Sequence, residues 1–353
     1  MKIVLTGGGT AGHIMPNLAL LPLLKTSFDG IYYLGSESGM EAALAQRAGL
    51  TFYALPCAKL RRSLSVKNLA LPFTVLKGIR EAKRLLKKLK PDVVFSKGGY
   101  VALPVVFAAA SLKIPVVAHE SDVTMGLANR LSAPKCKRIC LTFDVPGRKP
   151  ANSVVTGTPL RRQLYRGNPD TALAAAGFDR KRPVILVLGG SSGARAINNA
   201  VEGARHMLND FNVIHIAGKG TKPLPNGGNY FRIEFAHDIE NYLAAADLVV
   251  SRAGAGTVCE LLALKKPMLL IPLPKTASRG DQLQNAGLLK ERGLAWVLPQ
   301  EQLTPQTLLY NIESCLLGSP SMAKALGGAP DIDGTTKVYR EIVNTALEYK
   351  KRP

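Results

Sequence analysis

Short apolar runs rich in β-branched residues alternate with longer stretches of helical pattern along this whole chain. The runs lie at residues 2–5, 31–34, 93–95, 115–118, 184–188, 213–216, 247–251 and 268–271. Because these runs are continuously apolar rather than alternating, both faces of each predicted strand must be covered by other elements. The pattern predicts an α/β protein whose parallel sheets are covered by helices.

The two halves of the chain repeat one device, a strand followed by a glycine turn and the start of a helix. Residues 3–13 read Ile-Val-Leu-Thr-Gly-Gly-Gly-Thr-Ala-Gly-His, and residues 185–195 read Ile-Leu-Val-Leu-Gly-Gly-Ser-Ser-Gly-Ala-Arg. A weaker similarity relates Ser-Lys-Gly-Gly at 96–99 to Ser-Arg-Ala-Gly at 251–254. The repetition predicts two Rossmann-like, doubly wound domains in tandem.

Pro and Gly residues cluster between 146 and 159, where a domain boundary is expected. We therefore predict a first domain over 1–157 and a second over 158–333. Residues 334–353 are expected to form a C-terminal helix that packs back on the first domain. Asp331 and Asp333 precede this helix and basic residues end it, an order that suits the helix dipole.

Composition excludes a disordered protein and a disulfide-stapled miniprotein, because the 46% hydrophobic content of the 353 residues supports full-sized cores. The net charge of +21 favours an anionic partner. The five cysteines lack zinc-type spacing, which predicts a reduced cytoplasmic protein. No signal peptide is expected at the start of the chain, and the longest uncharged apolar stretch, 101–112, is too short to span a membrane.

The first glycine turn, 7–12, matches the pattern G-x-G-x-x-G, which brings backbone N–H groups close to a phosphate. With Glu37 as a ribose ligand it would also fit a nicotinamide oxidoreductase. His13 lies just inside the following helix and can reach a group above the turn. A histidine with an ordinary pKa near 6.5 suits proton abstraction at neutral pH.

The second glycine turn, 189–193, fits two mechanisms. It has the form G-x-S-x-G, and Asp210 and His237 follow in the order of a hydrolase triad. It equally fits a diphosphate-binding turn in which Ser191 donates to phosphate. We prefer the diphosphate interpretation because it explains the glycine turns of both halves.

Three further motifs contain carboxylates. Glu260 follows a third glycine turn and could accept both hydroxyls of a ribose. His119 and Glu120 follow a predicted strand at the edge where α/β sites gather. Asp331 and Asp333 resemble a metal-binding D-x-D, but helix capping explains them, so no metal is expected.

A strongly basic segment runs from Lys59 to Lys90, with eleven basic residues and one acidic residue. Apolar residues are interleaved with the basic ones, which is typical of a membrane-surface patch. Nucleic acid is the competing partner, but Phe73 is the only aromatic residue there for base stacking. The predicted patch consists of Leu69, Phe73, Leu76, Arg80, Lys83, Arg84 and Lys87.

Several motifs together resemble the MurG family of GT-B glycosyltransferases, nearly along the whole chain and in order. These motifs lie at 8–13, 96–100, 119–122, 157–161, 189–191, 252–260 and 281–286. The motif sequences Ser-Lys-Gly-Gly, His-Glu-Ser-Asp and Ser-Arg-Gly-Asp-Gln are most similar to those of the Gram-positive branch of the family. Ala11, where a glycine is common, and Asp122, where Asn is common, depart from the family pattern.

The resemblance implies a metal-free, inverting hexosyltransferase of peptidoglycan synthesis, with two Rossmann-like domains that face a cleft. Its substrates would be UDP-N-acetylglucosamine and the polyprenyl-diphosphate-linked muramyl-pentapeptide, and it would need no cofactor. It would be a peripheral protein on the cytoplasmic face of the cell membrane, where it would contact anionic lipids. Other cell-wall synthesis proteins are possible partners, and nucleic acid is not expected as one. The alternatives are a GT-B transferase with another lipid acceptor, such as diacylglycerol, and a UDP-N-acetylglucosamine epimerase.

The resemblance also implies roles for individual residues. His13 is the first choice as catalytic base, with Glu120 in reserve. In the donor site, Arg161 and Ser191 would contact the diphosphate, Glu260 the ribose, Gln282 the sugar and the Ala236 backbone the uracil. The remaining donor residues are Thr10, Ala11, Gly12, Asp122, Ser192, Ala255, Gly256, Thr257 and Asp281. The acceptor diphosphate would lie over Gly8, Gly9, Gly98, Gly99 and Tyr100.

Overall fold

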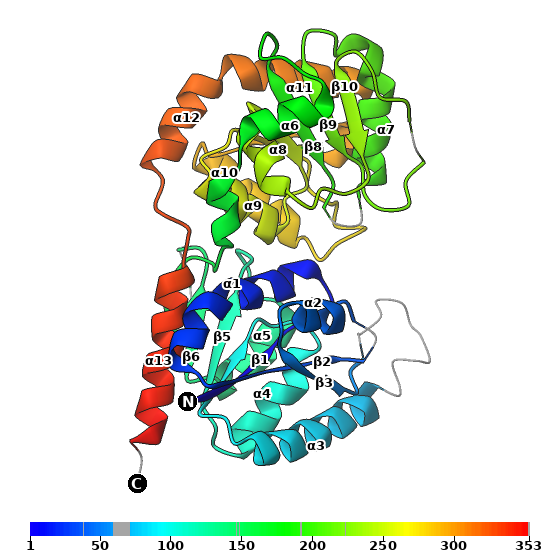
Figure 1. Cartoon of the computed structure of the whole chain (residues 1–353). Helices are drawn as coiled ribbons and strands as arrows, with labels where there is room; N and C mark the ends of the chain where they lie inside the picture. The colour runs from blue at the N-terminus through cyan, green and yellow to red at the C-terminus, as the bar shows by residue number, and fades with distance from the viewer. Residues whose placement is uncertain are drawn as a thin grey trace. The chain divides into compact units, whose positions relative to one another are not determined.

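The computed structural model describes residues 1–37, 39–58, 71–145, 147, 149–190, 193–222 and 224–351. The chain divides into two compact units. One comprises Met1–Arg161 together with Ile332–Pro353, and the other comprises Arg162–Asp331. Helices cover both faces of a parallel sheet in each unit, which confirms the predicted doubly wound α/β class (Figure 1).

The first unit contains a seven-stranded parallel sheet of order β3-β2-β1-β4-β5-β6-β7. The strands are β1 (Lys2–Thr6), β2 (Gly30–Ser36), β3 (Thr51–Leu55), β4 (Val93–Ser96), β5 (Val116–Glu120), β6 (Arg138–Leu141) and β7 (Ser153–Val155). The helices are α1 (Ala11–Ser27), α2 (Glu41–Arg47), α3 (Leu71–Leu89), α4 (Ala102–Ser111), α5 (Leu127–Ser132) and α13 (Thr335–Lys350). Strand β5 extends to Glu120, two residues beyond the predicted run, because His119 and Glu120 pair with β6.

Both faces of this sheet are buried, as the continuous apolar runs predict. Ile3 and Leu5 face a core shared with α1 and α13, whereas Val4 faces a core shared with α3 and α4. The hydroxyl of Tyr339 in α13 lies 2.5 Å from Ser27 Oγ, and Thr335 Oγ1 accepts a hydrogen bond of 2.9 Å from the Leu160 N–H. Helix α13 thus packs on the first unit.

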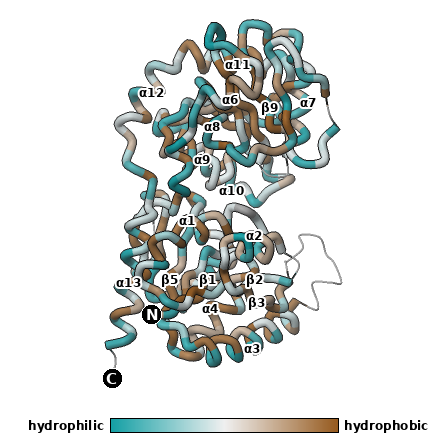
Figure 2. Tube along the Cα trace, in the orientation of Figure 1, coloured by the Kyte–Doolittle hydropathy of each residue, from teal (hydrophilic) through white to brown (hydrophobic). Residues whose placement is uncertain are grey.

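The second unit contains a six-stranded parallel sheet of order β10-β9-β8-β11-β12-β13. The strands are β8 (Val184–Leu188), β9 (Asn212–Ile216), β10 (Tyr230–Ile233), β11 (Leu248–Ser251), β12 (Met268–Leu270) and β13 (Trp296–Val297). The helices are α6 (Pro169–Ala176), α7 (Arg195–Ala204), α8 (Ile239–Ala245), α9 (Ala255–Ala263), α10 (Asp281–Glu291), α11 (Pro305–Leu317) and α12 (Ser319–Gly328). Brown, hydrophobic segments mark the strands in the interior (Figure 2).

The first five strands of each unit lie in the order 3-2-1-4-5. Successive strands therefore run outward to one side of the first strand and then continue on its other side. This change of side lies between β1 and β4 in the first unit and between β8 and β11 in the second. Ligands of open α/β sheets bind at the carboxyl ends of the strands at such a switch point. The glycine turns recognised in the sequence follow these four strands.

In the described part of the chain, no helix is long and apolar enough to cross a membrane. All five cysteines are free thiols, and four of them are buried.

Candidate functional site

The glycine turns of the first unit pack backbone against backbone at the β1/β4 switch point. Gly9, Gly98 and Gly99 have φ values of +87°, +85° and +80°, which L side chains rarely adopt. A Cβ on Gly99 would lie 2.6 Å from the carbonyl oxygen of Gly8. Only glycine therefore allows the turns after β1 and β4 to approach this closely. Of the predicted acceptor residues in these turns, Gly9 is exposed and Gly99 half-buried, whereas Gly8 and Gly98 are buried.

His13 lies in the first turn of α1, half-buried, beside these glycine turns. Its Nδ1 lies 2.9 Å from Thr10 Oγ1, and its backbone N–H donates to the Thr10 carbonyl at 3.1 Å. A Cβ on Gly99 would come within 3.5 Å of His13 Nδ1, so the ring lies next to the turn after β4. Thr10 and Gly12 are exposed. The backbone of Ala11 begins α1.

Glu120 is buried and accepts three hydrogen bonds at the end of β5. Oε1 accepts from the Asp122 N–H at 3.2 Å, and Oε2 accepts from the Gly126 N–H and from Asn129 Nδ2, both at 2.9 Å. Asn129 also donates to the carbonyl of His119 at 3.1 Å. The carboxylate thus fastens the loop between β5 and α5, which includes the half-buried Asp122.

The ring of Tyr100 lies against the first glycine turn, since a Cβ on Gly9 would lie 2.7 Å from Tyr100 Cε1. Burial raises the pKa of Tyr100, although a hydrogen bond with Ser36 opposes that shift. Ser36 in turn donates to Glu41 Oε1 from its hydroxyl at 2.5 Å and from its N–H at 3.0 Å. Tyr100, Ser36 and Glu41 therefore form one polar cluster.

Glu41 was missed in the sequence, where Glu37 drew attention instead. Glu37 is exposed, whereas Glu41 is fully buried beneath the first glycine turn. A Cβ on Gly8 would lie 2.5 Å from Glu41 Oε1. The available signal was an acidic residue in the first turn of a short helix, where a carboxylate is favoured by the helix dipole.

Lys97 and His119 are also buried under this edge of the sheet. Lys97 Nζ donates to Ser121 Oγ at 2.6 Å, and a Cβ on Gly7 would lie 2.9 Å from Lys97 Cβ. Burial, reinforced by the charge of Lys97, holds the pKa of His119 well below its usual value. His119 is therefore neutral and donates from Nε2 to the Gly157 carbonyl at 2.9 Å. Lys97, which the sequence analysis quoted only as part of a motif and gave no role, places a cation beneath the glycine turns.

In the second unit, the turn between β8 and α7 packs on the segment after β9. Gly190 and Gly193 have φ values of +85° and +71°, and a Cβ on Gly193 would lie 2.2 Å from the carbonyl oxygen of Ala217. The predicted phosphate ligands Ser191 and Ser192 lie outside the described residues. The described parts of the turn place the start of α7 at the switch point.

The turn after β11 leads into α9, which carries Glu260. Gly254 caps this helix, and open space surrounds a Cβ built on Gly254 or Gly256. Of the other predicted residues, Ala255 is buried, Thr257 is half-buried and Glu260 is half-buried. Among the described residues, none from outside this turn and α9 therefore covers Gly254 or Gly256 closely.

Two side chains from the motifs at 252–260 and 281–286, to which the sequence analysis gave no role, hold the turn after β11 in place. The buried Asn285 donates from Nδ2 to the Ala253 carbonyl at 3.0 Å. The Arg252 guanidinium donates to the Ile271 carbonyl at 3.0 Å and to Gln300 Oε1 at 2.6 Å. Burial lowers the pKa of Arg252. Both side chains fix backbone, a role that a local motif does not reveal.

The remaining predicted donor residues lie on different elements of the two units. Asp281 and Gln282 begin α10, and Gln282 Oε1 accepts from the Leu273 N–H at 3.0 Å. Ala236 is half-buried and follows β10. Arg161 is half-buried and is the last residue of the N-terminal part of the first unit.

Helix α3 carries the described part of the predicted membrane patch. Phe73 is 76% exposed and Leu76 is 52% exposed, and Arg80, Arg84 and Lys87 continue their face at helical spacing. Lys83 is half-buried, and Leu69 lies outside the described residues. The opposite face of α3 packs on the first unit, and Figure 2 shows brown and teal segments alternating along the helix.

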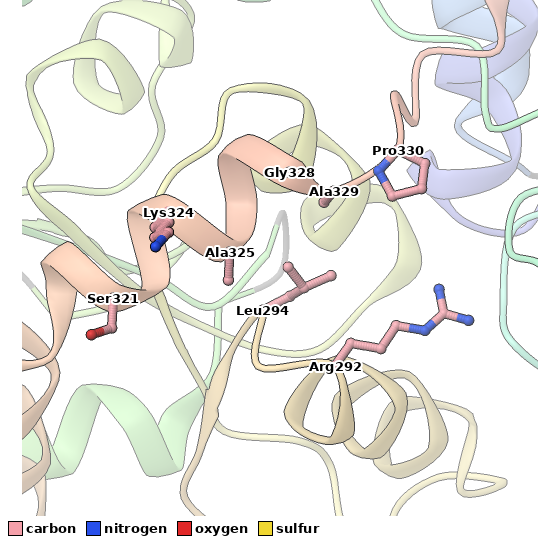
Figure 3. A pocket seen from close by; sticks show the side chains of 8 residues that line it. All are labelled: Arg292, Leu294, Ser321, Lys324, Ala325, Gly328, Ala329 and Pro330. Carbon is pink, nitrogen blue, oxygen red and sulfur yellow. The ribbon is translucent and has the colours of Figure 1, made fainter.

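No group of three or more His, Cys, Asp or Glu residues that could hold a metal occurs in the part of the chain that the structure describes. Asp333 Oδ1 accepts from the Thr335 N–H at 2.9 Å and from its hydroxyl at 2.5 Å, so this carboxylate binds the start of α13. A hollow of about 560 Å³ lies between α12 and the end of α10 in the second unit and presents Arg292 and Lys324 (Figure 3). None of the predicted site residues lines it.

Comparison with known proteins places the chain in a family. Residues 3–141 match the glycosyltransferase family 28 N-terminal domain, and residues 184–333 match the C-terminal domain of that family. The UDP-N-acetylglucosamine–N-acetylmuramyl-(pentapeptide) pyrophosphoryl-undecaprenol N-acetylglucosamine transferase of Clostridium botulinum strain Langeland is 45% identical over 350 residues, covering 96% of this chain and 99% of that protein.

Solved structures agree with this assignment. The crystal structure of Acinetobacter baumannii MurG is similar with a TM-score of 0.76 and 28% identity, covering 97% of this chain and 99% of that one. A UDP-GlcNAc 2-epimerase from Neisseria meningitidis has a TM-score of 0.68 over 99% of this chain and 100% of its own, but at 16% identity it shows the fold alone. The chain belongs to glycosyltransferase family 28 and, within it, to the MurG family.

Proposed function

We propose that this enzyme transfers N-acetylglucosamine from UDP-N-acetylglucosamine to the muramyl sugar of undecaprenyl-diphospho-N-acetylmuramyl-pentapeptide, which converts lipid I to lipid II in peptidoglycan synthesis. The observation that carries this proposal is the 45% identity, along nearly the whole chain, to a transferase of that specificity. The glycine turns at the switch points of both sheets are consistent with two substrates that each contain a diphosphate.

The second unit would hold the donor. The Glu260 carboxylate would accept the two ribose hydroxyls, and the backbone at Ala236 would meet the uracil. Gln282 has its Oε1 bound to the Leu273 N–H, which leaves its amide N–H groups oriented for the sugar. The start of α7 would stabilise the negative charge that develops on the departing diphosphate, because helix N-termini favour anions.

The first unit would hold the acceptor and the base. If Thr10 Oγ1 accepts the Nδ1–H of His13, the basic lone pair of the ring lies on Nε2, the nitrogen that would receive a proton. The acceptor hydroxyl would lose its proton to His13 as its oxygen bonds to the anomeric carbon. The bond from that carbon to the UDP oxygen would break with its electron pair leaving on UDP, in one inverting displacement.

Glu120 supports the acceptor side in another way. Its carboxylate already accepts three hydrogen bonds, two from the loop between Asp122 and Gly126 and one from Asn129 of α5, which engage most of its acceptor sites. We therefore assign Glu120 to positioning that loop, and His13 to the proton transfer. Lys97 adds a cation beneath the turns where the acceptor diphosphate would lie.

The exposed face of α3 would attach the enzyme to the cytoplasmic face of the membrane. Each basic residue near an anionic surface contributes about 1 kcal/mol, and exposed apolar side chains add a contribution that salt does not screen. Phe73 and Leu76 together with Arg80, Arg84 and Lys87 supply both kinds of group on one face. This face lies on the unit that would hold the lipid-linked acceptor.

Incubation with UDP-N-acetylglucosamine and a short-chain muramyl-pentapeptide lipid tests the proposed reaction. We expect UDP release that depends on this acceptor, together with a product heavier by one N-acetylhexosamine. UDP release with diacylglycerol instead would identify another lipid transferase. Conversion of the donor to an isomeric sugar nucleotide without any acceptor would identify an epimerase.

A further inference from the structure

A chain of buried hydrogen bonds crosses the second unit from β10 through β9 to α7. The hydroxyl of Tyr230 in β10 lies 2.7 Å from Nδ1 of His215 in β9. His215 Nε2 lies 3.0 Å from Asn198 Oδ1 in α7, and Asn198 Nδ2 donates to the Ala217 carbonyl at 2.9 Å. All three side chains are at least nine-tenths buried.

The partners fix the direction of every bond in this chain. Because Asn198 Nδ2 donates to a carbonyl, its Oδ1 is the acceptor and His215 must carry its proton on Nε2. Nδ1 of the neutral ring then accepts the Tyr230 hydroxyl proton. Burial, reinforced by the charge of Arg232, lowers the pKa of His215 to about 3, so the ring remains neutral at physiological pH.

The chain ends where two segments of the candidate donor site meet. The Ala217 carbonyl that accepts from Asn198 is the same oxygen against which Gly193 packs. Ala217 and Gly218 donate their N–H groups to the carbonyls of Ile233 and Glu234, at 2.9 and 3.0 Å. These bonds join the segment after β9 to the one after β10, which leads to Ala236.

We propose that Tyr230, His215 and Asn198 are positioning residues for the donor. They hold the start of α7, where the diphosphate would lie, in register with the segments after β9 and β10, where the base would lie. A ligand that spans both regions needs this register, whereas a ligand that occupies only the base and ribose region does not. The inference rests on the proposed function, since it requires a nucleoside diphosphate in this unit.

The experiment compares the affinities of UDP and uridine for the full chain by isothermal titration calorimetry. His215→Leu removes the donor to Asn198, and we expect it to weaken UDP binding at least about tenfold while uridine binding changes less than about twofold. His215→Gln retains an N–H donor at the Nε2 position and should keep UDP affinity within about threefold. Tyr230→Phe removes only a hydroxyl and should weaken UDP binding about threefold, so the test survives if His215→Leu does not fold.

Asn212→Leu is the matched control. Asn212 lies in the same strand and is buried, but its Nδ2 donates to the Asp179 carbonyl at 2.8 Å, at the opposite end of β9. We expect it to lower thermal stability without changing UDP affinity. Equal losses for UDP and uridine in the His215 and Tyr230 variants, or no loss in either, would overturn the positioning role. Failure of the unaltered chain to bind UDP would instead overturn the proposed function, and this inference with it.

Discussion

Replacement of Glu120 by Gln separates a catalytic base from a residue that fastens a loop. The side chain accepts hydrogen bonds from the N–H groups of Asp122 and Gly126 and from Asn129 Nδ2. Glutamine has the same shape but one acceptor oxygen, which can still serve Gly126 and Asn129 and must abandon Asp122. One lost bond and two bonds weakened by the loss of charge amount to about 2–4 kcal/mol of folding free energy.

The kinetic expectation follows from the same contacts. If the carboxylate only holds the loop, Glu120→Gln should reduce turnover less than about tenfold, because most of the loop's attachment remains. His13→Ala should reduce turnover by about 10²–10⁴, the usual contribution of a general base, and leave UDP affinity nearly unchanged. Glu120→Ala, which removes all three bonds, should be much less stable than Glu120→Gln.

The assay is initial-rate UDP release on the short-chain acceptor, with thermal unfolding and UDP titration on each variant. Glu120→Asn offers a further control, since it carries the same amide one methylene short of the loop. The reasoning would be refuted if folded Glu120→Gln lost as much turnover as His13→Ala while UDP affinity was preserved. Glu120 would then be the base, and the three hydrogen bonds would serve to orient it.

Four other predictions address the rest of the site and the membrane face. Glu260→Ala should weaken UDP by about 2–4 kcal/mol in calorimetry, because two ribose hydroxyls lose their acceptor; unchanged affinity would remove this residue from the site. Gly99→Ala should lower the melting temperature and turnover together, since its Cβ would lie 2.6 Å from the Gly8 carbonyl oxygen; an unchanged melting temperature would contradict this. EDTA should leave activity unchanged, and a loss that Mg²⁺ or Mn²⁺ restores would contradict a metal-free mechanism. Replacement of four basic residues of α3 by Gln should abolish most sedimentation with anionic vesicles, without changing turnover on the soluble acceptor. The same change at four exposed sites of the second unit should leave sedimentation intact. Full sedimentation of the α3 variant would place the attachment elsewhere. The α3 sites are Arg80, Lys83, Arg84 and Lys87, and the control sites are Lys181, Arg182, Lys290 and Lys324.

The doubly wound fold follows from local sequence because its signals are local. A strand buried on both faces must be continuously apolar, and a turn that approaches a neighbouring backbone must be glycine. The turns containing Gly9 and Gly99 and the turn containing Gly193 satisfy the second condition, and each can be recognised from a few consecutive residues. The sequence therefore predicted both the fold class and the strand ends at which the candidate sites lie.

Side chains that act through tertiary partners could not be recognised in this way. The sequence drew attention to Glu120 because it follows a strand, but its three donors are supplied by a loop and helix that fold back on it. Glu41 gains its importance only when α2 carries it beneath Gly8, which needs the β2–β1 pairing.

The buried chain from Tyr230 to Asn198 makes the same point more strongly. Its members come from β10, β9 and α7, and they meet only because those strands are neighbours in the sheet order. Taken singly in the sequence, each is an ordinary polar residue near an apolar run. Since burying such a group without a partner is costly, each must have its partners supplied by the fold. The sequence thus reveals where a ligand can approach the backbone, whereas the sheet order determines which buried side chains hold that backbone in position.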